Sequence, residues 1–348
     1  MTTSPPSSPP QRSRGWRIVR AILLVVLGLL ALLVLVIVVA AFVPIRVENP
    51  IVSRAAADYD EALAQIEAIW DEENETADFN PVCQSILMTH GERVERAIVF
   101  YHGFTSCPEQ FRELGRRFFD LGYNVYVPLA PYHGLTDRYG TALENLTAAD
   151  LAAHGTETAD IAQGLGEHVT VSGLSGGGAI AAWLGQNRAD VELAAPMAPF
   201  IGVRFVPGVW LNKGLTNLIR VLPNVYRWWD PINRENNPMS APYSYVGYPL
   251  RSMGTYMELG FDAFAAAGNT PPASAAQLMI LNASETSVSN TVGERLTERW
   301  AEQGGAATHY TLARNLRLPH DFISVTRPNV DVEVVYPLLI ELLTEARP

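Results

Sequence analysis

The residues with the clearest chemistry are a serine framed by glycines and a histidine far downstream. Residues 171–178 read Val-Ser-Gly-Leu-Ser-Gly-Gly-Gly, which contains the frame Gly173-x-Ser175-x-Gly177. A serine in this frame can occupy a sharp strand-to-helix turn that exposes its hydroxyl to a base. Because a serine hydroxyl is a weak nucleophile at neutral pH, it needs a histidine, and the histidine needs a carboxylate that fixes its tautomer. The frame therefore indicates acyl-transfer chemistry if both partners are present.

Only two histidines follow Ser175 in the chain. His309 lies inside a predicted strand at 308–312, where a general base is poorly placed. His320 lies in the loop between that strand and the last predicted helix. Where such a triad runs in the chain order nucleophile, acid, histidine, this loop is the position of the base. We predict that His320 is the general base for Ser175.

The acid is expected in the loop that follows the strand predicted at 277–282. Glu285 is the only carboxylate in that loop, so we predict that it orients His320, although aspartate is the commoner acid at such positions. Asp321 is adjacent to His320 and poorly placed to reach its ring. Two further carboxylates are fallback candidates from the middle of the chain, Asp230 and Asp262.

Acyl transfer also needs donors aimed at the oxyanion that forms in the transition state. The strand predicted at 97–101 runs into a turn that begins at His102, where backbone amides can point inward. We expect the oxyanion hole to consist of the backbone N–H groups of Phe104 and Gly176. His102 is then a structural residue of the turn, and no catalytic role is predicted for its side chain.

A regular alternation of strands and helices positions these residues. Such an alternation is typical of a mostly parallel sheet with helices on both faces. The residues predict strands at 84–89, 97–101, 124–128, 168–172, 192–195, 277–282 and 308–312. They predict helices at 108–121, 143–164, 176–186, 290–303 and 331–345.

The segment at about 202–274 interrupts this alternation. An insertion of this size between two strands of a sheet is usually functional, and we interpret it as a lid whose aromatic side chains line an apolar acyl pocket. The alternative is that the aromatics pack the small core of the lid itself. Those side chains are Trp210, Trp228, Trp229, Tyr243, Tyr245 and Tyr248.

The N-terminal segment predicts a membrane anchor. Residues 1–20 are expected to form a disordered, basic tail, and residues 21–43 are apolar without a charge, which is long enough to span a bilayer as a helix. A cleaved signal peptide is the main alternative, although its apolar region is usually shorter. All basic residues before residue 44 precede the span, so we expect a cytoplasmic N-terminus and a catalytic domain in the periplasm or outside the cell. Residues 44–80 are predicted to form a juxtamembrane helix or stalk.

Charge and cysteine content narrow the setting further. The chain has a net charge of −11, and the part beyond the span is more acidic still, which argues against nucleic acid as a partner. Its two cysteines, Cys83 and Cys107, can form a disulfide in an oxidising compartment or remain as two buried thiols. Neither has a neighbour at the spacing of a metal site.

Several motifs in order resemble the α/β-hydrolases of the monoacylglycerol lipase, lysophospholipase and carboxylesterase type. The resemblance covers residues from about 84 to the C-terminus, apart from the insertion. It implies an eight-stranded sheet, a lid domain and an ester hydrolase without a metal or cofactor. The motifs are Tyr101-His-Gly-Phe-Thr105, Gln110-Phe-Arg-Glu-Leu114, Gly122-Tyr-Asn-Val-Tyr-Val-Pro128, His133-Gly134 and Gly173-Leu-Ser-Gly-Gly177.

The chain departs from this family at three points. It has Pro131-Tyr-His-Gly134 where many members have Pro-Gly-His-Gly, and it has Glu285 where aspartate is usual. A membrane span and paired cysteines are also not general features of the family. The sequence thus predicts a membrane-anchored serine hydrolase for lipid, lysophospholipid or small acyl esters. The alternatives are an amide or peptide hydrolase of the prolyl-aminopeptidase type on the same triad, and a non-catalytic binding protein with this fold.

Overall fold

The computed structural model describes residues 14–238, 240–327 and 330–345. Its core is a seven-stranded sheet with the order β1-β3-β2-β4-β5-β8-β9. β1 is antiparallel to β3, and the other neighbouring pairs are parallel. The strands are β1 (Ile86–Met88), β2 (Val94–Tyr101), β3 (Asn124–Val127), β4 (Gly166–Leu174), β5 (Leu193–Met197), β8 (Ala276–Asn282) and β9 (Ala306–Leu312).

The seven strands predicted from the residues are confirmed, whereas the eighth strand that the family resemblance implied is absent from the described part of the chain. Before β1 the chain forms helix α2 (Tyr59–Glu75) and a short turn of 3-10 helix at Pro81–Cys83, so β1 is an edge strand. The central strands β3, β5 and β8 are buried along their whole length, as expected for parallel strands that helices cover on both faces.

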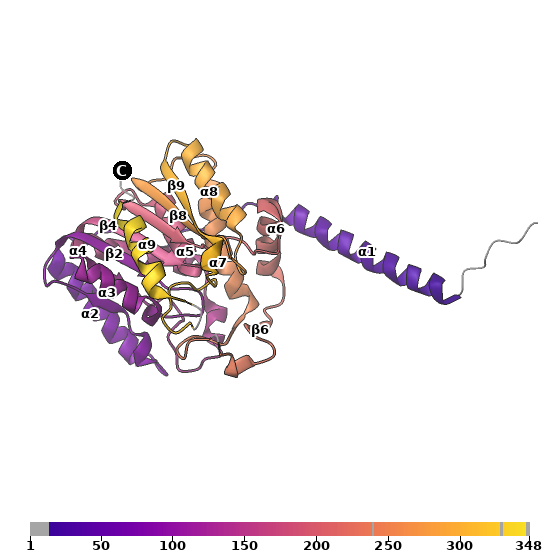
Figure 1. The fold of residues 1–348 in the computed structure, drawn as a ribbon, viewed down its shortest axis with the longest axis horizontal. Helices are drawn as coiled ribbons and strands as arrows, with labels where there is room; N and C mark the ends of the chain where they lie inside the picture. Colours follow the sequence, from indigo (N-terminus) through magenta and orange to yellow (C-terminus); the bar gives the residue numbers. More distant parts are fainter. Residues whose placement is uncertain (1–13, 239, 328–329, 346–348) are drawn as a thin grey trace, which may run out of the picture.

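Helices follow the strands in the predicted order. Thr147 and Asp150 form a reciprocal capping box at the start of α4, which satisfies two backbone donors there. Helices α4, α5 and α7 pack against one another, and α9 crosses in front of the sheet in Figure 1. Their bounds are α3 (Arg112–Asp120), α4 (Ala148–Leu165), α5 (Gly176–Asn187), α7 (Leu250–Ala266), α8 (Asn290–Glu302) and α9 (Val332–Glu345).

The insertion is smaller than predicted. Its first part contains helix α6 (Gly208–Val221) and an antiparallel pair of short strands, β6 (Tyr226–Trp228) and β7 (Gly247–Pro249). Its last part, which we expected to belong to a lid, forms α7, whose buried side chains pack on α5. Helix α7 is therefore a core helix of the domain, and the inserted segment is confined to about 202–249.

Helix α1 (Arg14–Ala40) projects away from the domain (Figure 1). Among the described residues, Gly15–Ala40 is the one helix that is long and apolar enough to cross a membrane, with a mean hydropathy of 3.7 over its most apolar 18 residues. Residues 14–20, which we expected in a disordered tail, are helical, and 41–43 form a turn beyond the helix end. The rest of the predicted tail, residues 1–13, lies outside the described residues.

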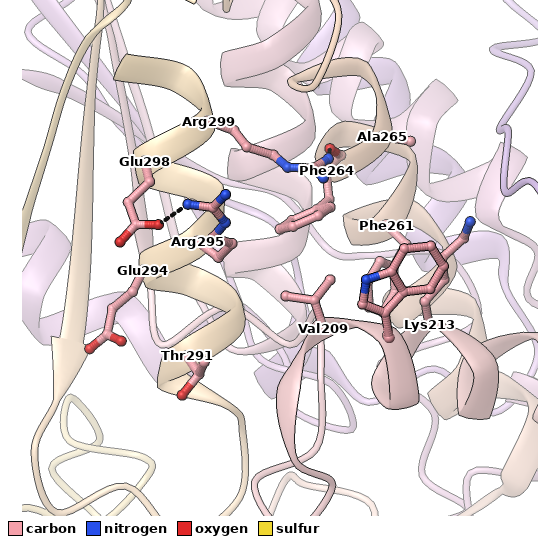
Figure 2. A pocket seen from close by; sticks show the side chains of 11 residues that line it. Val209, Lys213, Phe261, Phe264, Ala265, Thr291, Glu294, Arg295, Glu298 and Arg299 are labelled. Carbon is pink, nitrogen blue, oxygen red and sulfur yellow. Dashed lines mark hydrogen bonds and ion pairs between the residues drawn. The ribbon is translucent and has the colours of Figure 1, made fainter. Parts of the chain in front are cut away.

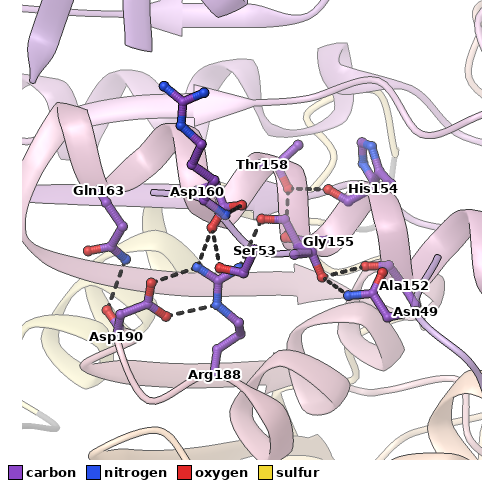
Figure 3. Close-up of polar contacts among 12 residues, drawn as sticks. Asn49, Ser53, Ala152, His154, Gly155, Thr158, Asp160, Gln163, Arg188 and Asp190 are labelled. Carbon is purple, nitrogen blue, oxygen red and sulfur yellow. Dashed lines mark hydrogen bonds and ion pairs between the residues drawn. The ribbon is translucent and has the colours of Figure 1, made fainter. Parts of the chain in front are cut away.

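For residues 44–80 we predicted a juxtamembrane helix or stalk; the helix is present as α2, but the segment packs on the domain and does not stand apart from it as a stalk. Helix α2 packs on α4, and the Trp70 indole on α2 donates to the carbonyl of Ser85 at 2.8 Å. Before α2, the chain is fastened to the domain by side-chain hydrogen bonds (Figure 3). Asn49 donates to Thr156 at 2.7 Å and Ser53 donates to Asp160 at 2.8 Å. Residues 44–75 are thus an integral layer of the hydrolase-like domain.

The two cysteines are joined. Cys83 and Cys107 form a disulfide with their Cα atoms 5.3 Å apart. Both are fully buried, and they pack against Ala241 and Tyr243 of the inserted segment. The bridge therefore ties the chain before β1 to the turn after β2, on the side of the domain that the insertion covers.

Candidate active site

Ser175 occupies a strained turn between β4 and α5. Its backbone has φ 58° and ψ −111°, a conformation that L-residues adopt at a cost of about 1–3 kcal/mol. The flanking glycines are required by space: a Cβ on Gly173 would lie 2.6 Å from the backbone of Gly177, and a Cβ on Gly177 would lie 1.9 Å from the carbonyl oxygen of Tyr101. Close backbone packing thus explains the Gly-x-Ser-x-Gly frame and presents Ser175 at the carboxyl end of β4.

The structure brings His320 and Glu285 together. His320 Nδ1 lies 2.8 Å from Glu285 Oε2. The side chain of Glu285 is almost fully buried, and that of His320 is one-fifth exposed. Because a carboxylate only accepts hydrogen bonds, Nδ1 is the donor, and Nε2 of the neutral ring is left as the acceptor. This is the tautomer that a general base for a serine hydroxyl needs.

Backbone amides hold Glu285 in its loop after β8. Its second oxygen, Oε1, accepts from the N–H groups of Thr286 at 2.7 Å, Ser287 at 2.6 Å and Val288 at 3.3 Å. Burial by itself raises the pKa of Glu285, but the hydrogen bond and charge of His320 and the backbone N–H groups outweigh it, so that the pKa lies below its ordinary value. The carboxylate is therefore charged at neutral pH.

The alternative acids have other partners. Asp321 accepts from Ser324 Oγ at 2.7 Å and pairs with Arg327. Asp262 accepts from the N–H of Val47 and from the Trp183 indole, both at 2.9 Å. Asp230 accepts from its own loop, at Ile232 and Asn233. The geometry thus favours Glu285 over all three as the partner of His320.

Ser175 and His320 line one cavity of about 490 Å³, a volume typical of small-molecule sites. Within the described residues no hydrogen bond joins the Ser175 hydroxyl to the His320 ring. Hydrogen bonds of this kind are often long in the absence of substrate and tighten when it binds. The cavity thus brings the predicted nucleophile and the predicted base to one place.

The two backbone amides predicted for the oxyanion hole lie close to Ser175. A Cβ on Gly176 would lie 2.9 Å from the backbone nitrogen of Phe104, so the turn after β2 packs directly on the start of α5. Within the described residues, neither the Phe104 N–H nor the Gly176 N–H donates a hydrogen bond. Phe104 and Ser175 both line the cavity. Both N–H groups are thus available for the role of oxyanion-hole donors that the sequence predicts.

Two side chains to which the sequence analysis gave no role hold the turn after β2. Gln110 accepts from the Gly103 N–H at 2.7 Å. His133 Nε2 accepts from the N–H of Thr105 at 3.3 Å, and Thr105 has a positive φ of 66°. Burial lowers the pKa of His133 to about 4, which keeps it neutral and able to accept. Gln110 and His133 both lie in motifs that resemble the α/β-hydrolases, and this resemblance was the sequence signal that could have indicated their role in the turn.

His102 is a structural residue of the turn, as predicted. Its Nε2 accepts from the Ala130 N–H and its Nδ1 donates to the Gly103 carbonyl, both at 3.0 Å. Burial, with the charge of His133 as a smaller contribution, lowers the pKa of His102 well below its ordinary value. Both ring nitrogens are occupied by backbone groups, so none is left for a substrate.

The insertion contributes only part of its aromatic set to this cavity. Trp229, Tyr245 and Tyr248 line it, together with Phe200 and Met253. The predicted lining role fails for the other three aromatics, which pack elsewhere. Trp228 packs against Tyr226 and Tyr139, Tyr243 packs on the disulfide, and Trp210 faces a different hollow.

That second hollow, of about 440 Å³, lies between α6, α7 and α8 (Figure 2). Apolar side chains such as Val209, Phe261 and Phe264 form one side, and the ion pair of Arg295 with Glu298 forms another. It contains neither Ser175 nor His320. Among the described residues, no group of three or more metal-ligating side chains gathers at either cavity or elsewhere.

The chain has the α/β-hydrolase fold. Residues 92–246 match the family model described as serine aminopeptidase, S33. No curated protein matches the chain at the level of sequence. Solved structures resemble it in fold, at sequence identities of 13–16%.

Three of these structures illustrate the likeness. A structure described with the metagenome-derived lipolytic enzymes LipS and LipT has a TM-score of 0.57 at 16% identity, over 77% of this chain and 99% of its own. The monoacylglycerol lipase of Paleococcus ferrophilus has a TM-score of 0.54 at 14% identity, over 75% and 98%. A soluble variant of the monoglyceride lipase of Saccharomyces cerevisiae has a TM-score of 0.53 at 13% identity, over 75% and 90%.

Proposed function

We propose that this chain is a membrane-anchored serine hydrolase that cleaves carboxylic esters through an acyl-enzyme on Ser175. The observation that carries the proposal is the joint placement of three residues. Ser175 stands at a strained turn in the same cavity as His320, and His320 is held at 2.8 Å by the buried carboxylate of Glu285. A nucleophile, a base and an orienting acid are the parts that such chemistry requires.

In the proposed mechanism, Ser175 Oγ attacks the acyl carbonyl carbon while its proton passes to His320 Nε2. Glu285 stabilises the imidazolium that forms. The carbonyl oxygen becomes an oxyanion and accepts hydrogen bonds from the N–H groups of Phe104 and Gly176. When the C–O bond of the ester breaks, His320 returns the proton to the leaving alcohol. Water then attacks the acyl-enzyme by the same route, which releases the acid and restores Ser175.

The lining of the cavity favours an apolar acyl group. Phe200, Trp229, Tyr248 and Met253 form much of its apolar wall. Burial of an acyl chain against such a wall contributes about 0.8 kcal/mol for each CH₂ group. The proteins of similar fold include ones named as lipolytic enzymes and monoacylglycerol lipases, which supports a lipid or small apolar ester as substrate.

An amide or peptide hydrolase is the second candidate, because the matching family model is described as a serine aminopeptidase. An aminopeptidase must bind the α-ammonium group of its substrate, for which a carboxylate is the natural partner. Of the described residues that line the cavity, Asp321 alone carries a carboxylate, and it is engaged with Ser324 and Arg327. The cavity thus favours ester over aminopeptidase chemistry.

The anchoring part of the proposal rests on α1. Its side chains are exposed along the apolar stretch, which in water would be unfavourable and in a bilayer is the expected arrangement. The arginines that precede the stretch support a cytoplasmic N-terminus, and with it a domain in the periplasm or outside the cell.

Full-length protein in detergent tests the chemistry directly. We expect hydrolysis of p-nitrophenyl esters from acetate to decanoate, no hydrolysis of amino-acid p-nitroanilides, and loss of ester hydrolysis in Ser175→Ala. Preference for the anilides would favour the peptidase, and activity on neither would favour a binding protein. Ester hydrolysis that persists in Ser175→Ala would refute the nucleophile.

A further inference from the structure

Hydrogen bonds and close packing fix the orientation of the domain relative to α1. Asn217 on α6 donates to the carbonyls of Ala40 at 2.9 Å and Val43 at 3.0 Å, which caps the end of α1. Helix α6 also crosses α1 closely, since a Cβ on Gly214 would lie 1.9 Å from the carbonyl oxygen of Ile37. Only a short turn separates α1 from the buried side chain of Ile45.

The chain beyond Ile45 continues this attachment. The N–H of Val47 donates to Asp262 on α7, and the backbone N–H of Arg54 donates to Asp160 at 2.7 Å. Asp160 is itself paired with the buried Arg188 (Figure 3). Because no flexible stalk intervenes, the direction of α1 determines which side of the domain faces a bilayer. In Figure 1, that side is the one that carries α6 and β6.

Helix α6 has an inverted polarity. Its buried side chains include the polar Asn212, Thr216 and Asn217, and Asn212 is satisfied by the N–H of Val203 and the carbonyls of Val206 and Gly208. A surface helix in water shows the opposite pattern, with apolar residues inside and polar residues outside. Helix α6 buries Ile219 as well but exposes Trp210 and Val221, and exposed apolar residues of this kind are found in helices at a lipid interface.

We group the exposed apolar side chains of α6 and of the loops beside it as one candidate surface, which we call the α6 face. Two of its members are among the most exposed apolar residues of the chain, with Ile232 at 90% and Phe205 at 81%. The α6 face is continuous with the end of α1, since the rings of Phe42 and Trp210 are 5.4 Å apart. It consists of Phe205, Trp210, Val221, Leu222, Val225 and Ile232.

The charge around this face differs in sign from that of the chain as a whole. The protein has a net charge of −11, whereas residues 202–249 contain five basic and two acidic residues. Among the basic ones, the side chains of Arg204, Arg227 and Arg234 are exposed, whereas Arg220 pairs with Glu258 at 2.7 Å. Basic residues that flank an apolar surface are suited to the phosphate groups of anionic lipids.

We propose that the α6 face docks on the bilayer surface at which α1 emerges. Its apolar side chains enter the boundary between headgroups and acyl chains, and its arginines contact anionic lipid phosphates. This inference rests on the proposed anchoring by α1. Phe205 and Trp229 line the cavity that contains Ser175 and are themselves exposed, so the mouth of the cavity opens beside the docked face. An amphiphilic ester therefore reaches Ser175 from the lipid layer and not through bulk water.

Photo-crosslinking in the full-length protein tests the docking without reference to activity. p-Benzoylphenylalanine is incorporated singly in place of Ile232, Val221, Leu30, Leu121 or Val334, and the protein is reconstituted into vesicles of phosphatidylcholine and phosphatidylglycerol. Leu30 lies within α1, while Leu121 and Val334 are exposed positions at the end of α3 and on α9. We expect phospholipid adducts from positions 30, 221 and 232 and none from 121 and 334.

Three other labelling patterns would contradict the proposal. Adducts from position 30 without any from 221 and 232 would overturn the docking and leave the anchor in place. The absence of adducts from position 30 would overturn the anchor and, with it, the docking. Equal labelling at 232 and 334 would show that no particular face meets the lipid.

A pair of matched double variants tests the route of the substrate. Val221→Asp with Ile232→Asp places two charges on the α6 face, and Leu121→Asp with Val334→Asp places the same two charges elsewhere. None of the four residues lines the cavity. We expect the first variant to hydrolyse a monoacylglycerol embedded in vesicles at least about tenfold more slowly, with p-nitrophenyl butyrate hydrolysis unchanged, and the second to match the wild type on both. Equal rates of both variants on vesicles would overturn the route through the lipid layer.

Discussion

Two glycines permit equally close approaches in parts of the molecule with different surroundings. At Gly177, a Cβ would lie 1.9 Å from the carbonyl oxygen of Tyr101, and at Gly214 a Cβ would lie 1.9 Å from that of Ile37. The first contact packs α5 onto the end of β2 and thereby sets Ser175 beside Phe104. The second packs the inserted helix α6 onto α1. The same close packing thus occurs at the turn that carries Ser175 and at the contact between α6 and α1.

The difference lies in what surrounds each contact. Gly177 is in the buried core, where neighbouring strands and helices leave one arrangement open. Gly214 belongs to a helix that exposes Trp210 and Val221, and in the proposed docking these side chains meet lipid. We therefore expect changes at the catalytic turn to affect fold and chemistry together, and changes at the α1–α6 contact to leave the chemistry intact.

Gly177→Ala should have the largest effect. The added methyl group would overlap the carbonyl oxygen of Tyr101, which belongs to the backbone of β2 and cannot easily move away. We therefore expect the free energy of unfolding to fall by about 3 kcal/mol or more. We also expect no measurable ester hydrolysis. Thermal unfolding followed by circular dichroism, with a p-nitrophenyl ester assay, measures both. Gly28→Ala in α1, where the Cβ meets nothing within 4 Å, is the matched control. A stable, active Gly177→Ala variant would show that the elbow is less tightly packed than described.

Glu285→Gln should lower turnover by roughly 10²–10⁴-fold with the fold retained, because the amide neither fixes the His320 tautomer nor stabilises the imidazolium. Steady-state kinetics on a p-nitrophenyl ester give the ratio. Asp321→Asn, next to His320 in the chain, is the matched control and should lose less than about tenfold. If the two variants exchanged these effects, the acid would be Asp321.

The same carboxylate predicts a pH effect on stability. The pKa of Glu285 in the folded protein is below the ordinary value of 4.5, so its charged form stabilises the fold fully above that pH. This contribution is lost as the pH falls through the lowered folded pKa. Urea unfolding between pH 7 and pH 3 should therefore show that the stability difference between wild type and Glu285→Gln shrinks below about pH 4.5. A difference that grows on acidification would reverse the sign of the shift.

The disulfide lies where the sheet domain meets the insertion, so its loss should affect stability more than the proposed chemistry. Replacing both Cys83 and Cys107 by serine opens a loop closed over a sequence separation of 24, which corresponds to about 3.5 kcal/mol in the chain-entropy model. Urea unfolding measures the change, and thiol titration of the denatured wild-type protein should find no free thiol. Two free thiols in exported wild-type protein would contradict the bridge.

Gly214→Ala should have the smallest effect on the domain. It forces α6 away from Ile37, and we expect a loss of about 1–3 kcal/mol at that contact, with hydrolysis of a soluble ester within about twofold of the wild type. Limited proteolysis between α1 and the domain should become faster. Loss of soluble-ester activity equal to that of Gly177→Ala would show that the two regions are not separable.

The same comparison explains what the sequence could predict. Every strand that was inferred from the residues is present, and the loops after β8 and β9 contain the pair Glu285 and His320 at hydrogen-bond distance. Buried parallel strands and glycine-framed turns leave local patterns, because their backbone geometry restricts which residues fit. The pairing of Cys83 with Cys107 was one of two open possibilities, and the structure decides it.

Other features had no local pattern to reveal them. Helix α7 resembled lid sequence because it followed an aromatic, proline-rich stretch, and its place on α5 depends on tertiary contacts. The segment around Asn49 and Ser53 was interpreted as part of a juxtamembrane helix or stalk. Its hydrogen bonds run to α4, more than 100 residues away along the chain, so no local pattern indicates them. His133 supports the turn after β2 through a backbone N–H, a contact that composition and spacing do not encode.

The central claim is that Ser175 is a nucleophile activated by its surroundings, and covalent trapping tests it most directly. Full-length protein is treated with a fluorophosphonate, digested and analysed by mass spectrometry, with Glu285→Gln in parallel. The account predicts a phosphonyl adduct on the peptide that contains Ser175, formed much more slowly in the variant. An adduct on a different serine, or ester hydrolysis that continues while Ser175 stays unmodified, would contradict it.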